Sequence, residues 1–132
     1  MQKGYLDKNT LLGSEKERYW EIPVSDKRSN FLRIKQRGSR RRKGETHKTA
    51  FTRKRLVWGV DSTKSDVVFA IEELKEEDGN EAIRFGYWTW TRKKGSWTWA
   101  QFAPMIQLSD LHELLNLAKS NQFYLIPSES SS

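Results

Sequence analysis

Two Trp-Thr-Trp triplets constrain the fold of this chain more than any other feature of its sequence. They flank a basic turn at residues 92–95. A symmetric turn there would pair Trp90 with Trp97, and Trp88 with Trp99. Directly opposed side chains in a β-hairpin lie on the same face, so the four indoles are predicted to gather on one side.

The direction of this Trp face separates two interpretations. Each indole offers a flat surface on which any nucleobase can stack, with a contribution of about 1–3 kcal/mol per base. The same side chains could instead form the core of the sheet, in competition with Phe85, Tyr87 and Phe102 on the opposite face. The sequence leaves both orientations open.

Further strands are predicted wherever apolar and polar residues alternate with a period of two. Polar or glycine-containing turns separate them, and the acidic run from Glu72 to Glu77 is interpreted as a solvated turn. The alternating segments are residues 18–24, 30–37, 55–60, 66–74, 81–91 and 96–103.

One helix is predicted after the last strand, where leucines recur at helical spacing up to Ala118 and Ser109 suits the N-cap. The predicted fold class is therefore α+β, a mainly antiparallel twisted β-sheet with one C-terminal α-helix packed on one face. We expect a flexible N-terminal arm over residues 1–16, a single domain over 17–127 and a disordered Ser-rich tail over 128–132.

Charge is distributed unevenly along the 132 residues. The net charge is +7, yet residues 27–55 alone carry thirteen basic side chains and one acidic one. A polarised charge distribution can steer a polyanion onto one surface of a protein. The chain is also rich in aromatic residues, at 12%. Aromatic side chains together with a basic segment favour a surface that binds nucleic acid.

Several classes of site are excluded by composition. The chain has no Cys and two His, so disulfides, zinc–thiolate sites and a Cys nucleophile are absent, and no multi-His metal centre is expected. No apolar run approaches the length of a membrane span, and the N-terminus lacks the apolar stretch of a signal peptide. We expect an intracellular protein, in the cytoplasm or the nucleus or nucleoid, with no cofactor, metal, catalytic residue, small-molecule substrate or membrane partner.

The predicted ligand is single-stranded DNA or RNA. The basic face of residues 31–37 interleaves cations with Phe31, and cations can follow phosphates while an aromatic ring stacks on a base. Base stacking is assigned to Phe31, Trp88, Trp90, Trp97 and Trp99. Phosphate binding is assigned to Arg28, Arg33, Lys35, Arg37, Arg40, Arg41, Arg42, Lys43, Arg92, Lys93 and Lys94.

A family resemblance agrees with this ligand class. One stretch of the chain resembles the first hairpin of PUR repeats. It consists of Arg18-Tyr19-Trp20-Glu21-Ile22, a turn with Lys27 and Arg28, and then Phe31-Leu32-Arg33-Ile34-Lys35. Residues 106–119 resemble the closing strand, cap and helix of those repeats. Whirly proteins and the single-strand-binding transcriptional coactivators share this plan. The resemblance implies binding of single-stranded nucleic acid and a possible homodimer.

Two other functions stay open. A protein-interaction module would bind a partner chain on the Trp face. A magnesium-dependent nuclease would use Glu73-Leu74-Lys75 with Asp61 and Asp66 upstream, where carboxylates hold the metal and the lysine stabilises the attacking water. The many acids around this motif make its spacing permissive.

Overall fold

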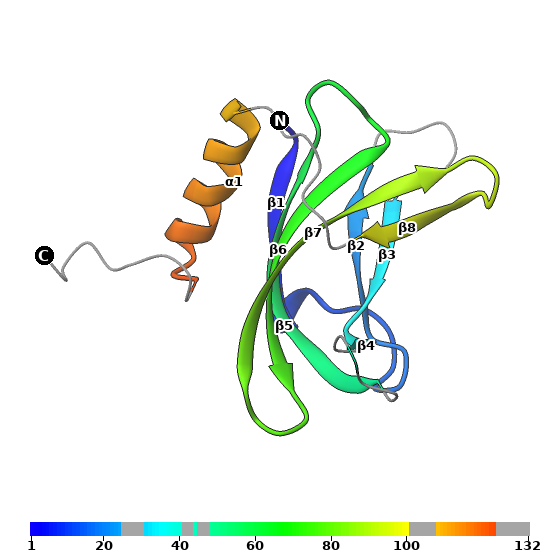
Figure 1. Cartoon of the computed structure of the whole chain (residues 1–132), viewed down its shortest axis with the longest axis vertical. Helices are drawn as coiled ribbons and strands as arrows, with labels where there is room; N and C mark the ends of the chain where they lie inside the picture. Colours follow the sequence, from blue (N-terminus) through cyan, green and yellow to red (C-terminus); the bar gives the residue numbers. More distant parts are fainter. Residues whose placement is uncertain (25–30, 41–43, 45–47, 101–107, 124–132) are drawn as a thin grey trace, which may run out of the picture.

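The computed structural model describes residues 1–24, 31–40, 44, 48–100 and 108–123. It is mostly antiparallel β-sheet with one C-terminal helix, which confirms the predicted α+β class (Figure 1). In chain order the elements are β1 (Lys3–Asp7), a 3-10 turn η1 (Lys8–Thr10), β2 (Tyr19–Pro23), β3 (Phe31–Lys35), β4 (Arg37–Arg40), β5 (Thr49–Val60), β6 (Val67–Glu76), β7 (Glu81–Thr91), β8 (Ser96–Ala100) and α1 (Leu108–Ser120).

The strands form one large sheet and one small one. The large sheet has the order β1-β5-β6-β7-β8, and β4 pairs with the first part of the long strand β5. The small sheet is the β2–β3 hairpin. Helix α1 covers one face of the large sheet, and the β2–β3 hairpin lies on its other side (Figure 1).

The β2–β3 hairpin closes the larger of two apolar clusters. Its inward side chains, among them Trp20 and Leu32, are buried against side chains that β5, β6 and β7 direct to the same side. Trp20 also donates its indole N–H to the backbone oxygen of Asp7, 2.7 Å away, which ties the hairpin to the end of β1. The period-two alternation predicted for this hairpin is therefore present, with one face inside and one outside.

Helix α1 packs over the opposite face of the large sheet. Leu114, Ala118 and Phe123 are buried there against Val57 and Phe69. The helix begins at Leu108, so Ser109 lies inside its first turn and the predicted N-cap position is wrong. Within the part of the chain that the structure describes, no helix is long and apolar enough to cross a membrane.

The first residues do not form the expected flexible arm. Residues 3–7 are strand β1, which pairs with residues 55–59 of β5, and Asp7 caps the turn that follows. The strand is short, and its partner lies about fifty residues further along the chain. Local periodicity carries no information about such a pairing.

Gly38 to Lys48 is a basic segment that none of the predicted strands includes, and its first residues belong to strand β4. Residues 37–40 pair with residues 49–52 of β5. Strand β4 follows β3 after only Gln36, so the chain passes from the small sheet into the large one over a single residue.

Candidate nucleic-acid interface

The outer face of the β2–β3 hairpin carries aromatic and basic side chains. On β3, Phe31, Arg33 and Lys35 are exposed while the intervening residues are buried. The sequence predicted this alternation, and the structure confirms it. From β2, Tyr19 lies on the same outer face, and the Arg33 guanidinium carbon lies 3.4 Å from the centroid of the Tyr19 ring.

The Trp hairpin forms with the predicted register. Trp90 is opposite Trp97 and Trp88 is opposite Trp99 on strands β7 and β8. The four indoles point toward the β2–β3 hairpin, away from helix α1, so this face is turned inward. The Trp face therefore serves partly as core and partly as accessible surface, because burial of these indoles is incomplete.

Trp88 belongs to the core. Its side chain is only 5% exposed, so the prediction that it stacks on a base is wrong. Trp99 is half-buried and covers Trp88, with the ring centroids 4.5 Å apart. Gly86 makes room for Trp99, since a Cβ at that glycine would lie 2.2 Å from the Trp99 ring. This inner pair holds the two strands together.

The outer pair borders a groove between the two hairpins. Trp90 and Trp97 are half-buried, with centroids 5.6 Å apart and ring planes inclined by 73°. The groove has a volume of about 470 Å³, and we call it the Trp groove. Its lining residues are Phe31, Leu32, Arg33, Trp88, Trp90, Gly95, Ser96 and Trp97.

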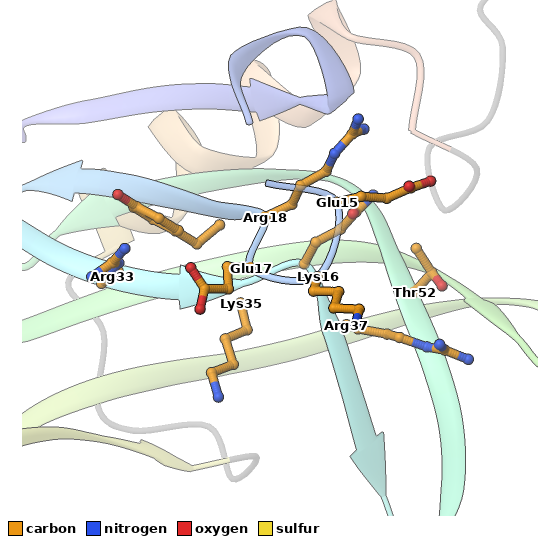
Figure 2. Close-up of a pocket in the computed structure, with 10 residues that line it drawn as sticks. Glu15, Lys16, Glu17, Arg18, Arg33, Lys35, Arg37 and Thr52 are labelled. Atoms are coloured by element: carbon orange, nitrogen blue, oxygen red, sulfur yellow. The ribbon is translucent and has the colours of Figure 1, made fainter. Parts of the chain in front are cut away.

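A second hollow shares one lining residue, Arg33, with the Trp groove. This hollow, which we call the Tyr19 pocket, has a volume of about 780 Å³ (Figure 2). It holds five cationic side chains and two carboxylates, so its net charge is positive. Its lining residues are Glu15, Lys16, Glu17, Arg18, Tyr19, Arg33, Lys35, Gln36, Arg37 and Thr52.

The predicted phosphate-binding residues that the structure describes fall into three groups. Arg33, Lys35 and Arg37 are exposed and line the Tyr19 pocket. The exposed residues 92–94 form the tip of the β7–β8 hairpin, beside the Gly95 end of the Trp groove. Arg40 ends strand β4. The remaining candidates, Arg28, Arg41, Arg42 and Lys43, lie outside the described residues.

Sequence reasoning did not identify Tyr19, Lys16 and Arg18 as site residues. Arg18 and Tyr19 were assigned only to the first predicted strand, and Lys16 to the N-terminal arm. The bridge between Leu12 and Tyr19 folds the segment before β2 back onto the hairpin. The available signal was the position of Tyr19 on the polar side of the first predicted strand, the side that carries the cations of β3.

The acids near the end of β6 are not in a solvated turn. Glu72, Glu73 and Glu76 have at most 4% of their surface exposed. The strand continues to Glu76, so these side chains point alternately toward the layers that pack on the two faces of the sheet. These carboxylates therefore add little to the acidic surface, and arginines within the sheet neutralise two of them.

Glu72 joins two arginines on the side of the β2–β3 hairpin. It accepts hydrogen bonds from the Nε atoms of Arg53 and Arg84, each 2.7 Å away. Burial lowers the pKa of the Arg53 guanidinium, and the Glu72 charge opposes that shift. Arg84 also lies 4.7 Å from the centroid of Trp99, which connects this charge layer to the Trp hairpin.

Glu73 makes the corresponding pair on the side of the helix. The Arg55 guanidinium donates to both of its carboxylate oxygens, and this hydrogen bonding raises the pKa of Arg55. Arg55 also donates to the backbone oxygens of Asn121 and Gln122 at the end of α1. The Glu73 carboxylate is therefore engaged in holding the helix.

The carboxylates proposed for a nuclease are dispersed. Asp61 accepts hydrogen bonds from Thr63 within a turn, and Glu73 is paired with Arg55. Across the described ranges, no group of three His, Cys, Asp or Glu residues is placed to hold a metal ion. Glu73 is thus better explained as a structural ion-pair partner.

Comparisons with protein-family models, curated proteins and solved structures found no match for this chain. The geometry of the site therefore carries the functional argument.

Proposed function

We propose that this protein binds single-stranded nucleic acid in the Trp groove and along the outer face of β3. The observation that carries the proposal is the meeting of two hairpins in one hollow. Phe31 and Arg33 come from the first hairpin, and Trp90 and Trp97 come from a hairpin about sixty residues further on. Aromatic faces beside cations are the combination that binds unpaired bases and their phosphates.

The shape of the groove favours a single strand over a duplex. Its aromatic rings can stack only on an exposed face of a base, so a base must leave its own stack to bind them. Bases in a duplex are already stacked and paired, and extracting one costs a few kcal/mol. A single strand can bend its bases into the groove while its phosphates remain near the exposed cations of residues 92–94.

The resemblance of the first hairpin to PUR repeats supports the same ligand class. The residues that carry it include Phe31, Arg33 and Lys35, which are the exposed residues of β3.

The test is a titration of fluorescein-labelled single-stranded DNA, single-stranded RNA and duplex DNA by fluorescence anisotropy, at several salt concentrations. We expect the single strands to bind more tightly than the duplex. Their affinity should fall by about 0.7 log units per log unit of salt for each phosphate contacted. A duplex preference, or binding that salt does not weaken, would count against the proposal.

The same titration with and without Mg²⁺ separates the alternatives. A protein-interaction module gives no anisotropy change with any oligonucleotide at low salt. A nuclease shortens the labelled strand only when Mg²⁺ is present. Intact oligonucleotide in both conditions is the result that the proposal requires.

A further inference from the structure

We infer that the Arg33–Tyr19 pair is a second base-stacking platform, so the bound strand extends from the Trp groove into the Tyr19 pocket. This inference rests on the proposed function and specifies the path of the ligand. Arg33 lines both hollows, so a strand that leaves the Trp groove at this side chain reaches the Tyr19 pocket.

The geometry of the pair is that of a prepared stacking surface. The guanidinium carbon lies 3.4 Å from the centroid of the Tyr19 ring, a distance at which the ring holds the planar cation in place. Arg33 is exposed on its strand. Unpaired bases stack on guanidinium planes as they do on aromatic rings. Tyr19 acts as a positioning residue for Arg33, which would contact the base.

The cations around this platform suit a backbone that follows the stacked base. Lys35 and Arg37 continue from Arg33 along β3 and into β4, and both line the Tyr19 pocket (Figure 2). Lys16 and Arg18 enter the pocket from the segment before β2. Two carboxylates, those of Glu15 and Glu17, also line the pocket, and the five cations leave it with a net positive charge.

The length of β3 matches a short run of nucleotides. From Phe31 to Lys35 the strand covers about 13 Å at about 3.3 Å per residue. A stacked strand advances about 3.4 Å per nucleotide, so about four nucleotides span the same distance. An oligonucleotide of about 3 nucleotides would fill the Trp groove, whereas one of about 10 would reach both platforms.

The experiment compares Tyr19→Leu and Tyr19→Phe with the native protein, using oligothymidylates and oligouridylates of about 3 and about 10 nucleotides at low salt. Tyr19→Leu removes the ring that supports Arg33, and Tyr19→Phe keeps it. We expect Tyr19→Leu to weaken binding of the longer strand about tenfold, with an unchanged salt slope and an unchanged affinity for the shorter strand. Tyr19→Phe should bind like the native protein.

Arg33→Lys provides a second variant that does not depend on the stability of Tyr19→Leu. It keeps the charge and removes the planar surface. We expect this substitution to lower the affinity for the longer strand about tenfold, while the salt dependence of binding stays the same. Thermal unfolding of each variant checks that the fold is retained.

The outcomes separate failure of this inference from failure of the proposed function. If the native protein binds neither oligonucleotide, the proposed function itself fails. If it binds both but Tyr19→Leu and Arg33→Lys bind as the native protein does, the second platform is overturned. Equal losses of affinity for the short and long strands in Tyr19→Leu would also overturn it, because Tyr19 does not line the Trp groove and the effect would then have been transmitted to that groove. A loss of affinity confined to the longer DNA or to the longer RNA supports the inference and identifies which polynucleotide uses the platform.

Discussion

Trp90 and Trp97 face each other across the β7–β8 hairpin with their ring centroids 5.6 Å apart, at the border of the groove that separates this hairpin from β3. The second Trp pair of the same hairpin is deeper, and its Trp88 is buried. One hairpin therefore serves two purposes, because its inner pair anchors the sheet and its outer pair lines the candidate site.

The first prediction separates the roles of the two pairs. Trp90→Leu should weaken single-strand binding by about 1–3 kcal/mol, because a stacking surface is lost from the groove. Trp88→Ala should lower the free energy of unfolding by about 3–5 kcal/mol, because it leaves a cavity in the core. Urea unfolding and anisotropy titrations measure both quantities. A Trp90→Leu protein with native affinity would remove Trp90 from the site.

A second prediction concerns the basic tip of the Trp hairpin. The double variant Lys93→Gln, Lys94→Gln should reduce the salt slope of single-strand binding by about 0.7 for each lysine that contacts a phosphate. The matched control is Lys75→Gln, Lys119→Gln, which removes the same charge on the side of the helix. The control should leave the slope unchanged, and equal effects of the two variants would show that binding follows net charge alone.

A third prediction concerns the buried charge layer. Glu72→Ala should lower the free energy of unfolding by about 3–5 kcal/mol, because Arg53 and Arg84 would lose the carboxylate that neutralises them. Glu77→Ala, at an exposed position just beyond β6, should change stability by less than about 0.5 kcal/mol. Denaturation of both variants in urea provides the comparison. Similar stabilities would mean that the ion pairs at Glu72 contribute little.

A fourth prediction tests the packing of Trp99 over Gly86. Gly86→Ala should destabilise the protein by about 1–3 kcal/mol, since its Cβ would overlap the Trp99 ring and approach the Ala100 backbone oxygen. The control is Ser96→Ala, an exposed position on the same hairpin. Thermal unfolding monitored by near-UV circular dichroism reports both stability and Trp packing. An unperturbed Gly86→Ala spectrum would contradict the close approach.

The sequence predicted those parts of the fold that depend on local pattern. Alternation located the β2–β3 hairpin, and a symmetric turn fixed the register of Trp90 and Trp97. The exposed face of Phe31, Arg33 and Lys35 followed from the same period of two. These features need only neighbours in the chain.

Features that depend on distant pairing could not be predicted in the same way. β1 pairs with β5 across about fifty residues, and Glu72 meets Arg53 only because β5 and β6 are adjacent. In the sequence alone, the acids of residues 72–77 cannot be distinguished from an acidic turn in solvent, because their arginine partners lie on other strands. The Trp groove likewise depends on how the two hairpins pack. The sequence identified the aromatic and basic residues of each hairpin, but it did not show that the two hairpins lie side by side.

The most direct test of the proposed interface is a titration of the ¹⁵N-labelled protein with a single-stranded oligonucleotide, followed by nuclear magnetic resonance. The six Trp residues give indole N–H signals, to be assigned with single Trp variants. We predict that the Trp90 and Trp97 indoles and the backbone amides of Phe31 and Arg33 shift together, while the Trp20 indole and the amides of α1 stay in place. Shifts confined to α1, or none at all in the Trp groove, would contradict the proposed interface.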